Sequence, residues 1–329
     1  MMAHLAAAAA APAWQSALHP AGPDAAAISQ LAWILFGGGT VIFVGVMVAC
    51  ALGLRRGRPV RPVLWIVGAG VLFPLVVLTV LLVFGVWRSA QLSEPSSRHA
   101  VKIAVVARMW WWEVRYTDPG GGEDVVLANE IRLPVGQPVY LGLSSADVIH
   151  SFWVPALAGK VDTVPGRLHG MTLQADRAGI YRAQCAEYCG EQHARMALHV
   201  VAQPPAEFQA WLAAQARPAG NGGTDLSPEH RAFIAQGRRA FVEQRCAACH
   251  TIRGVGVGVG TAAAGLGPDL THVGSRLYLG AGTLRNQPGA LAAWVADPHS
   301  VKPGVRMPAS ADMDGVTLRA LAAYLEQLK

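Results

Sequence analysis

Two uncharged apolar runs near the N-terminus constrain the fold of this 329-residue chain more than any other feature. Residues 31–54 and 63–87 are each about 24 residues long, enough to cross a hydrocarbon core of about 30 Å as a helix. The connecting residues 55–62 carry four arginines, and short loops rich in arginine stay in the cytoplasm. We therefore expect a transmembrane hairpin, with residues 1–30 and everything after the second span on the periplasmic side. Two buried helices of a soluble protein are the alternative.

The composition agrees with a membrane-anchored chain. Hydrophobic residues make up 52% of the sequence and charged residues 15%, and the mean hydropathy is +0.31. The net charge of +6 is modest, and we find no interleaved basic and aromatic stretch of the kind that binds single-stranded nucleic acid. A nucleic-acid partner is therefore not expected. Residues 1–30 contain no Lys or Arg, which disfavours a cleaved signal peptide because such peptides begin with a positive region.

The pattern changes twice after the apolar runs. Residues 98–203 contain short β-type segments separated by Gly, Pro and Asp turns, which predicts a small β-sandwich or barrel. The clearest of these segments are 102–106, 138–143, 179–183 and 197–201. Residues 204–228 are expected to form a short helix and a flexible linker. Residues 229–329 have helical periodicity and form a further domain.

A cluster of metal-binding residue types lies late in the β region. Cys185, Cys189, His193 and Met196 fall within one twelve-residue segment, and His150 precedes them on another predicted strand end. Sulfur and imidazole ligands select copper or zinc over hard cations, and a methionine favours copper. Two cysteines provide two thiolates, which can bridge a pair of copper ions. A zinc site and a disulfide are the alternatives.

The stretch 147–196, including 161–167, resembles subunit II of cytochrome c oxidase, whose cupredoxin-like barrel holds the binuclear copper centre CuA. The resemblance implies that the CuA ligands are His150, Cys185, Cys189, His193, Met196 and the backbone carbonyl of Glu187. It also implies a possible Mg or Mn site, shared with subunit I, at the Glu187 side chain. A quinol-oxidase barrel that has lost its copper is a further alternative.

The aromatic run 110–116 resembles the aromatic stretch of the same family, in which the first tryptophan admits electrons near CuA. The resemblance implies that Trp110 is the electron entry residue. The family more often has Gln at the position of Met109 and Glu at that of Arg115, so the local polarity differs here. The alternative is that Trp110, Trp112 and Tyr116 are ordinary core or membrane-interface aromatics.

A second cofactor motif lies in the C-terminal region. Cys246, Cys249 and His250 form the CxxCH signature of covalent haem c, in which the histidine is the proximal iron ligand. The surroundings resemble cytochromes c, and Met307 in the segment 301–308 matches the loop that carries the distal methionine. Met/His ligation raises the reduction potential of the iron. Met313 and a merely structural role for Met307 are the alternatives.

Two helices of this region match the crossing of the terminal helices in cytochromes c. Gly237 and Phe241 lie four residues apart on the first helix, and Leu321 and Tyr324 lie on the last. We therefore expect an all-α cytochrome c domain at the C-terminus.

Taken together, the resemblance covers nearly the whole chain and extends to the fused caa-type oxidases. It implies a multidomain fold with a two-helix transmembrane hairpin, a β cupredoxin-like barrel and an all-α cytochrome c domain. It further implies a proton-pumping oxidase in the bacterial inner membrane, with subunit I and other oxidase subunits as partners and a cytochrome c or a quinol-oxidising complex as donor. A CuA-bearing subunit of a nitric oxide reductase and a copper-delivery protein are the alternatives.

One departure from the family concerns protons. Many subunit II sequences carry a glutamate at the start of the second helix that serves a proton pathway into subunit I. The corresponding segment here, 60–65, contains no carboxylate. Because arginine stays charged and cannot exchange protons at working pH, we expect protons to enter through a carboxylate of subunit I or by another route.

Overall fold

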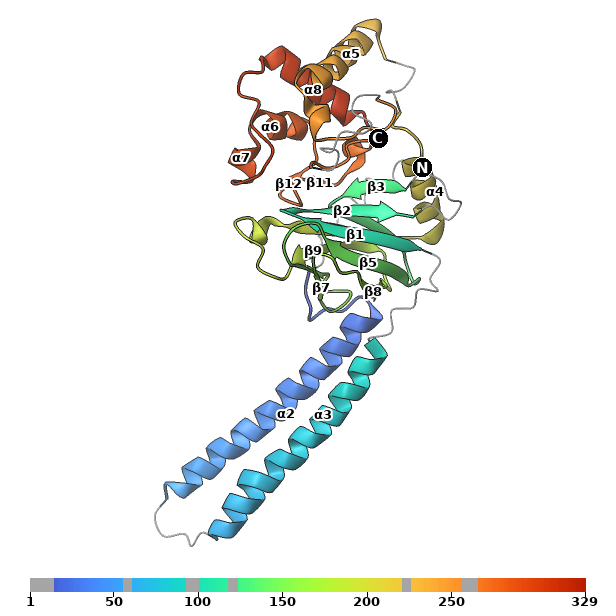
Figure 1. The fold of residues 1–329 in the computed structure, drawn as a ribbon. Coiled ribbons are helices and arrows are strands. Elements are labelled where there is room, and N and C mark those ends of the chain that lie inside the picture. The colour runs from blue at the N-terminus through green and yellow to red at the C-terminus, as the bar shows by residue number, and fades with distance from the viewer. Residues whose placement is uncertain (1–14, 56–60, 93–100, 118–123, 221–225, 256–265) are drawn as a thin grey trace.

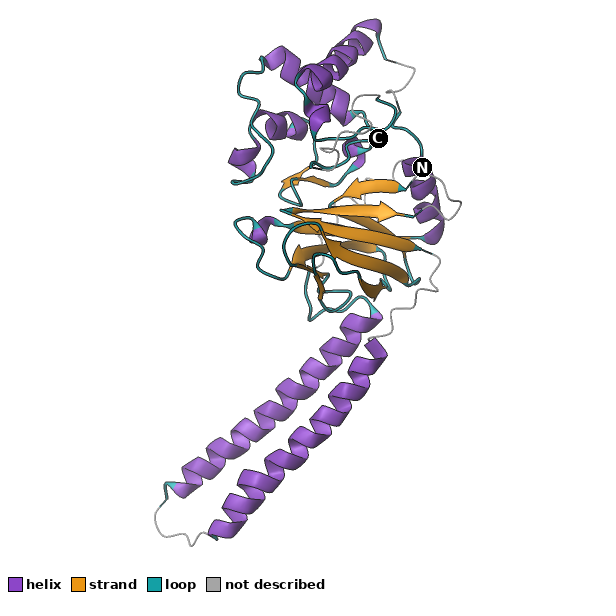
Figure 2. Ribbon diagram, viewed as in Figure 1, coloured by secondary structure: helices purple, strands orange, loops and turns teal. Residues whose placement is uncertain are grey.

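The computed structural model describes residues 15–55, 61–92, 101–117, 124–220, 226–255 and 266–329. Several predictions fall partly or wholly outside these ranges, namely residues 1–14 of the predicted periplasmic segment 1–30, most of the arginine-rich loop, a turn that the sequence predicts at 118–122 and part of a glycine-rich segment, 254–260, that the sequence predicts to be a loop. The described chain forms a helical hairpin, a β domain and a helical C-terminal domain (Figures 1 and 2).

Two long apolar helices extend from one end of the β domain (Figure 1). Helix α2 spans Pro23–Gly53, and the second helix is π-helical over Leu64–Leu72 (η1) and α-helical over Phe73–Leu92 (α3). Pro74 follows the junction, where the missing proline N–H favours a local change of hydrogen-bonding pattern. The two helices have segments with mean hydropathies of 2.3 and 2.8, and both are long enough to cross a membrane.

The hairpin begins earlier than the apolar pattern indicates. Helix α2 starts at Pro23, eight residues before the predicted span, because proline is well suited to the first turn of a helix. The two helices meet near the β domain, where Arg88 Nη2 donates a hydrogen bond to Gln30 Oε1 at 2.5 Å. Their apolar side chains are exposed along the rest of their length, as expected for surfaces that face lipid.

The β domain consists of two five-stranded sheets, ordered β3-β2-β1-β5-β8 and β4-β10-β9-β6-β7. Most neighbours are antiparallel, but β1 pairs with β5 and β4 pairs with β10 in parallel. The strands of the first sheet are β1 (Lys102–Arg108), β2 (Trp111–Tyr116), β3 (Val125–Ala128), β5 (Val139–Ser145) and β8 (His169–Leu173). Those of the second are β4 (Glu130–Pro134), β6 (His150–Trp153), β7 (Val161–Thr163), β9 (Gly179–Cys185) and β10 (Ala197–Gln203).

The core of this domain lies between the two sheets. Alternate residues of β1 point inward, so Ile103, Val105 and Ala107 are buried while their neighbours are not. Trp112 and Phe152 come from opposite sheets and meet edge to face with ring centroids 5.6 Å apart. The four β-type segments predicted from sequence lie in β1, β5, β9 and β10, except that Pro138 precedes β5, and the β cupredoxin-like fold is confirmed.

A short segment before the first helix also belongs to this domain. Ala21 is buried, its N–H donates to Ala156 O at 2.7 Å, and its carbonyl accepts from Asp176 N at 2.7 Å. The segment before α2 thus packs against the β domain, a contact that the sequence does not indicate.

The C-terminal domain is built on two crossing helices. Gly237 of α5 faces α8 so closely that a Cβ there would lie 1.9 Å from Ala320 O, and Phe241 contacts Tyr324 with ring centroids 6.3 Å apart. The predicted helix crossing is confirmed. The helices after the β domain are α4 (Pro205–Ala216), α5 (Pro228–Glu243), α6 (Ala290–Ala296), α7 (Pro298–Val301) and α8 (Gly315–Glu326).

Short elements complete the domain and the loop that precedes β10. A hairpin of β11 (Tyr278–Leu279) and β12 (Leu284–Arg285) lies between the helices and the β domain (Figure 1). Single turns of 3-10 helix occur at η2 (His193–Arg195), η3 (Cys246–Ala248) and η4 (Val273–Ser275).

Candidate copper and haem sites

The first site forms where two neighbouring strands end. His150 is the first residue of β6 and Cys185 is the last of β9, and the register that pairs Phe152 with Cys185 brings these ends together. The loop after Cys185 returns through η2 to β10 and carries Cys189 and His193. The topology therefore gathers residues that are 35 positions apart in the sequence.

The candidate ligand atoms lie close together. Cys185 Sγ is 3.7 Å from Cys189 Sγ and 3.9 Å from His150 Nδ1, and Cys189 Sγ is 3.7 Å from His193 Nδ1. The ligand atoms of His150, Cys185 and Cys189 all lie within 4.8 Å of one another. Glu187 O lies 3.2 Å from Cys185 Sγ. The two sequence-predicted thiols thus lie next to each other, with His150 and the carbonyl of Glu187 beside Cys185 and with His193 beside Cys189.

Met196 belongs to the same buried region. It is 1% exposed and lies in the hydrophobic cluster that also contains Cys185 and Cys189, and its carbonyl accepts from Cys185 N at 2.9 Å. A thioether buried in the same cluster as two thiols fits the donor set of a copper electron-transfer site and is unusual for zinc.

Both thiols are free. Their separation of 3.7 Å is much longer than the ~2.05 Å of a disulfide, so the loop presents two sulfur ligands rather than a crosslink. The hydrogen bond with Cys189 lowers the pKa of Cys185 to about 3 against the effect of burial, and the bond to His150 acts in the same direction. The same interaction raises the pKa of Cys189. One thiolate is therefore favoured even before a metal binds.

Asp147 orients the upstream histidine. His150 Nε2 lies 2.8 Å from Asp147 Oδ1, and Asp147 Oδ2 accepts from Met109 N at 2.7 Å. Because a carboxylate only accepts, Nε2 carries the proton and Nδ1 is left to face the thiols. His150 is fully buried, so this single contact fixes both its tautomer and its ring orientation. The sequence analysis missed Asp147, although its spacing of three residues from His150 could have indicated it.

Trp110 bridges the surface and the cysteine loop. Its Nε1 donates to Cys189 O at 2.9 Å, and the ring is only partly buried. Trp112 and Tyr116 instead lie in the core. Trp112 also meets the ring of His150 edge to face, with centroids 6.2 Å apart, so Trp110 and Trp112 both contact residues of the site.

The side chain of Glu187 turns away from the thiols. Its Oε2 lies 3.2 Å from Lys160 Nζ, which also lies 3.2 Å from Asp162 Oδ1. The carbonyl and the carboxylate of this residue therefore face different surroundings, and the Mg or Mn site stays a prediction.

The second site lies at the start of the C-terminal domain. Cys246 is the first residue of the η3 turn and Cys249 directly follows it, and both are free and partly buried. His250 Nδ1 lies 2.7 Å from Pro268 O. Since a carbonyl only accepts, Nδ1 is protonated and Nε2 keeps the lone pair that a metal requires. Burial lowers the pKa of His250 and so favours the neutral ring.

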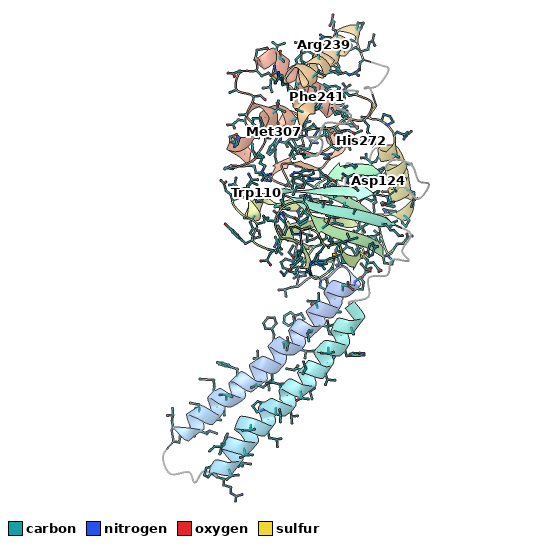
Figure 3. All side chains as sticks on the ribbon, in the orientation of Figure 1. Trp110, Asp124, Arg239, Phe241, His272 and Met307 are labelled. Carbon is teal, nitrogen blue, oxygen red and sulfur yellow. The ribbon has the colours of Figure 1, made fainter. Side chains whose placement is uncertain are left out.

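Met307 packs against the hydrophobic cluster of the same domain, as does its rival Met313. The thiols, the oriented imidazole and a thioether in one domain fit a covalent haem with two axial ligands. Figure 3 shows Met307 on the C-terminal domain and Trp110 on the β domain, on the same side of the molecule.

The fold and the two sites define a class of protein: a membrane-anchored cupredoxin with a cytochrome c domain fused to its C-terminal end. Residues 120–203 match the family model "Cytochrome C oxidase subunit II, periplasmic domain", and residues 234–329 match "Cytochrome c". Cytochrome c oxidase subunit 2 of Bacillus subtilis is 30% identical over 271 residues, which cover 78% of this chain and 72% of that protein. The chain belongs to the cytochrome c oxidase subunit II family.

The chain is also similar to another curated relative and to part of a solved structure. Cytochrome c oxidase subunit 2 of Alkalihalophilus pseudofirmus is 38% identical over 231 residues, which cover 70% of this chain and 62% of that protein. The crystal structure of the periplasmic domain of subunit II of cytochrome oxidase of Bradyrhizobium japonicum is 29% identical, with a TM-score of 0.33, and the match covers 36% of this chain and 94% of that one.

Proposed function

We propose that this chain is the electron-accepting subunit of a proton-pumping cytochrome c oxidase. It takes electrons from a cytochrome c or a quinol-oxidising complex and passes them to the haem–copper centre of a separate subunit I. The observation that carries the proposal is the convergence of His150, Cys185 and Cys189, whose ligand atoms lie within 4.8 Å of one another. Such a soft donor set suits electron transfer and offers no acid–base pair for bond-making.

The ligand cage of the first site consists of side chains held by the fold. His150, Cys185, Cys189, His193, Met196 and the carbonyl of Glu187 would bind the binuclear copper centre, which supplies a one-electron redox step. Strands β6 and β9 hold two of these ligands, and Asp147 holds the imidazole of His150 in one orientation. A cage that does not rearrange limits the structural change between oxidation states and excludes water.

The C-terminal site would hold covalent haem c, which supplies a second one-electron step. Cys246 and Cys249 would attach it, while His250 and Met307 would ligate the iron. Pro268 O keeps His250 Nε2 available. Trp110 is proposed as the entry residue because it contacts the backbone of Cys189 directly.

The proposed orientation places the metal domains in the periplasm and the arginine-rich loop in the cytoplasm of a bacterial inner membrane. The two apolar helices would contact the lipid bilayer and subunit I, and other oxidase subunits would complete the complex. A Mg or Mn ion at the Glu187 carboxylate, shared with subunit I, is part of the proposal.

The test is a Cys185→Ser variant in the assembled oxidase. It removes one of two thiolates without changing the C-terminal domain. We expect the variant to keep a reducible haem c but to lose the copper signal and oxygen consumption. Oxygen consumption at the wild-type rate would contradict the proposed function.

A further inference from the structure

The two metal-bearing domains share an interface that the linker alone does not explain. The β11–β12 hairpin lies against β4 and β10, where Leu277 N donates to Glu130 Oε2 at 2.9 Å and Ala197 N donates to Ala281 O at 3.1 Å. The ring of Tyr278 stacks on the buried ring of His199, with centroids 4.1 Å apart and an angle of 8° between the planes. This face of the C-terminal domain is fixed to the β domain by both backbone and ring contacts.

A second contact lies beside the predicted haem ligand. Lys302, five residues before Met307, donates from Nζ to Trp110 O at 2.8 Å. Pro303 O accepts from Gln192 Nε2 at 2.8 Å, and the guanidinium of Arg306 lies 5.9 Å from the centroid of the Trp110 ring. The loop that carries Met307 therefore lies directly on the tryptophan that contacts the cysteine loop.

The loop backbone must come very close for these contacts to form. Gly304 has a φ of +80°, and a Cβ at this position would lie 2.6 Å from Glu191 Cδ. Only glycine combines this conformation with the available space at no steric cost. The loop sequence is thus suited to a tight contact with the segment before His193.

Lys302 is poorly explained as a stabilising residue. It is 3% exposed, and burying an ammonium group costs free energy unless it is fully compensated. Burial lowers the pKa of this lysine to about 7, with Arg195 acting in the same direction and Cys189 opposing it. A neutral side chain would fill the space at less cost, so the hydrogen bond to Trp110 is the feature that requires a lysine here.

We propose that Lys302 is a positioning residue that, with the β11–β12 hairpin, keeps the C-terminal domain permanently docked with its Met307 loop on Trp110. This chain's own C-terminal domain then covers part of the Trp110 surface. This inference rests on the proposed function, because it assumes haem c and CuA at the two sites.

The test uses the assembled oxidase with the full-length chain. Lys302→Met removes the donor while keeping the length of the side chain, and Lys302→Arg restores a donor. Lys102→Met is the matched control, because Lys102 is exposed at the start of β1. Gly304→Ala is a second variant, which strains the backbone of the loop at its positive φ without touching Lys302.

Two readouts are needed. After flash reduction of haem c, we expect electron transfer to copper to slow about tenfold or more in Lys302→Met and Gly304→Ala, because small misplacements of reacting groups cost large factors in rate. Lys302→Arg should recover part of the rate. Amide hydrogen exchange of peptides covering 301–308 and 107–112 should rise about fivefold in the slow variants, with both metal spectra unchanged.

Wild-type transfer rates in both Lys302→Met and Gly304→Ala would overturn the proposal, as would an equal slowing in Lys102→Met. The exchange readout needs neither electron flow nor a donor. If the wild-type protein showed no haem-to-copper transfer at all, the proposed function would fail, whereas faster exchange in Lys302→Met would still report the docked loop.

Discussion

At the scale of single residues, the copper site depends on a side chain that binds no metal. Asp147 accepts from both His150 Nε2 and Met109 N, so it links the ligand to the segment that leads into Trp110. Replacing such a carboxylate typically costs 10- to 100-fold in metal affinity. The proposed ligands could be predicted from residue type and spacing together with the resemblance to the family. This supporting contact could not, because it depends on how the turn before β6 folds.

Asp147→Asn should therefore weaken copper binding by about 10- to 100-fold while leaving haem attachment unchanged. The amide cannot provide the same charge to the imidazole of His150. Copper titration followed by the near-infrared absorbance would measure the effect. Asp176→Asn, at an exposed position of the same domain, is the control. Equal copper affinity in the two variants would contradict this role for Asp147.

The distal ligand of the haem is a second prediction at this scale. Met307→Ala should leave haem attached through Cys246 and Cys249 but lower its reduction potential, because a thioether stabilises ferrous iron. A redox titration with optical detection would show the shift. Met313→Ala is the matched control, since both methionines pack against the same cluster. A potential that falls only in Met313→Ala would show that the assignment is wrong.

At the scale of elements, sequence patterns predicted individual strands and helices better than they predicted which strands pair with each other. The β-type segment 102–106 predicted a strand, and Gly237 and Phe241 with their counterparts on the last helix predicted a helix crossing, because each signal is a local pattern of residue types. The parallel pairs β1/β5 and β4/β10 join segments that are far apart. Likewise, nothing in the two-residue strands β11 and β12 indicates that they pack on β10.

The crossing of α5 and α8 is tested by Gly237→Ala. A Cβ at this position would lie 1.9 Å from Ala320 O, so the helices must separate, at a cost of about 1–3 kcal/mol. We expect a lower melting temperature for the C-terminal domain, followed by haem absorbance. Gly220→Ala is the control, because its Cβ would meet nothing within 4 Å. A melting temperature shared by both variants would count against the crossing.

The interface between the β11–β12 hairpin and β10 should weaken in acid. Burial lowers the pKa of His199 to about 4, with Glu130 opposing and Arg182 adding to the effect. Between pH 6.5 and 4 the unfolded chain therefore binds a proton that the folded chain excludes, so stability falls as the pH falls. The loss reaches at most about 3 kcal/mol from this group.

His199→Phe keeps a ring beside Tyr278 but cannot be protonated. Thermal unfolding of wild type and variant, measured from pH 7 to pH 4, should show the wild type losing more stability in that window. Parallel pH profiles for the two proteins would exclude His199 as the source of the acid sensitivity.

At the scale of the whole molecule, two apolar helices, a β domain and a docked C-terminal domain are arranged in sequence order along one long axis (Figure 1). The order of the domains was predictable from hydropathy and motifs. The docking was not, because it rests on single side chains such as Lys302 and Tyr278, which carry no pattern. The arrangement leaves the two apolar helices free to contact other subunits.

Proton uptake is a property of the assembled complex, and the segment 60–65 of this chain contains no carboxylate. Arg61→Gln should therefore leave proton uptake per oxygen unchanged in reconstituted vesicles, because an arginine neither gains nor loses protons there. Abolished uptake in this variant, with every candidate acid of subunit I dispensable, would contradict the expected route.

The central claim is that one chain holds both a two-copper centre and a covalent haem. Its most direct test is the metal and haem content of the purified full-length protein. The account predicts about two coppers for each covalently attached haem, since two bridging thiolates bind a pair of copper ions. A single zinc or a single copper at the cysteine loop, or a haem that is removed by acid–acetone extraction, would contradict it.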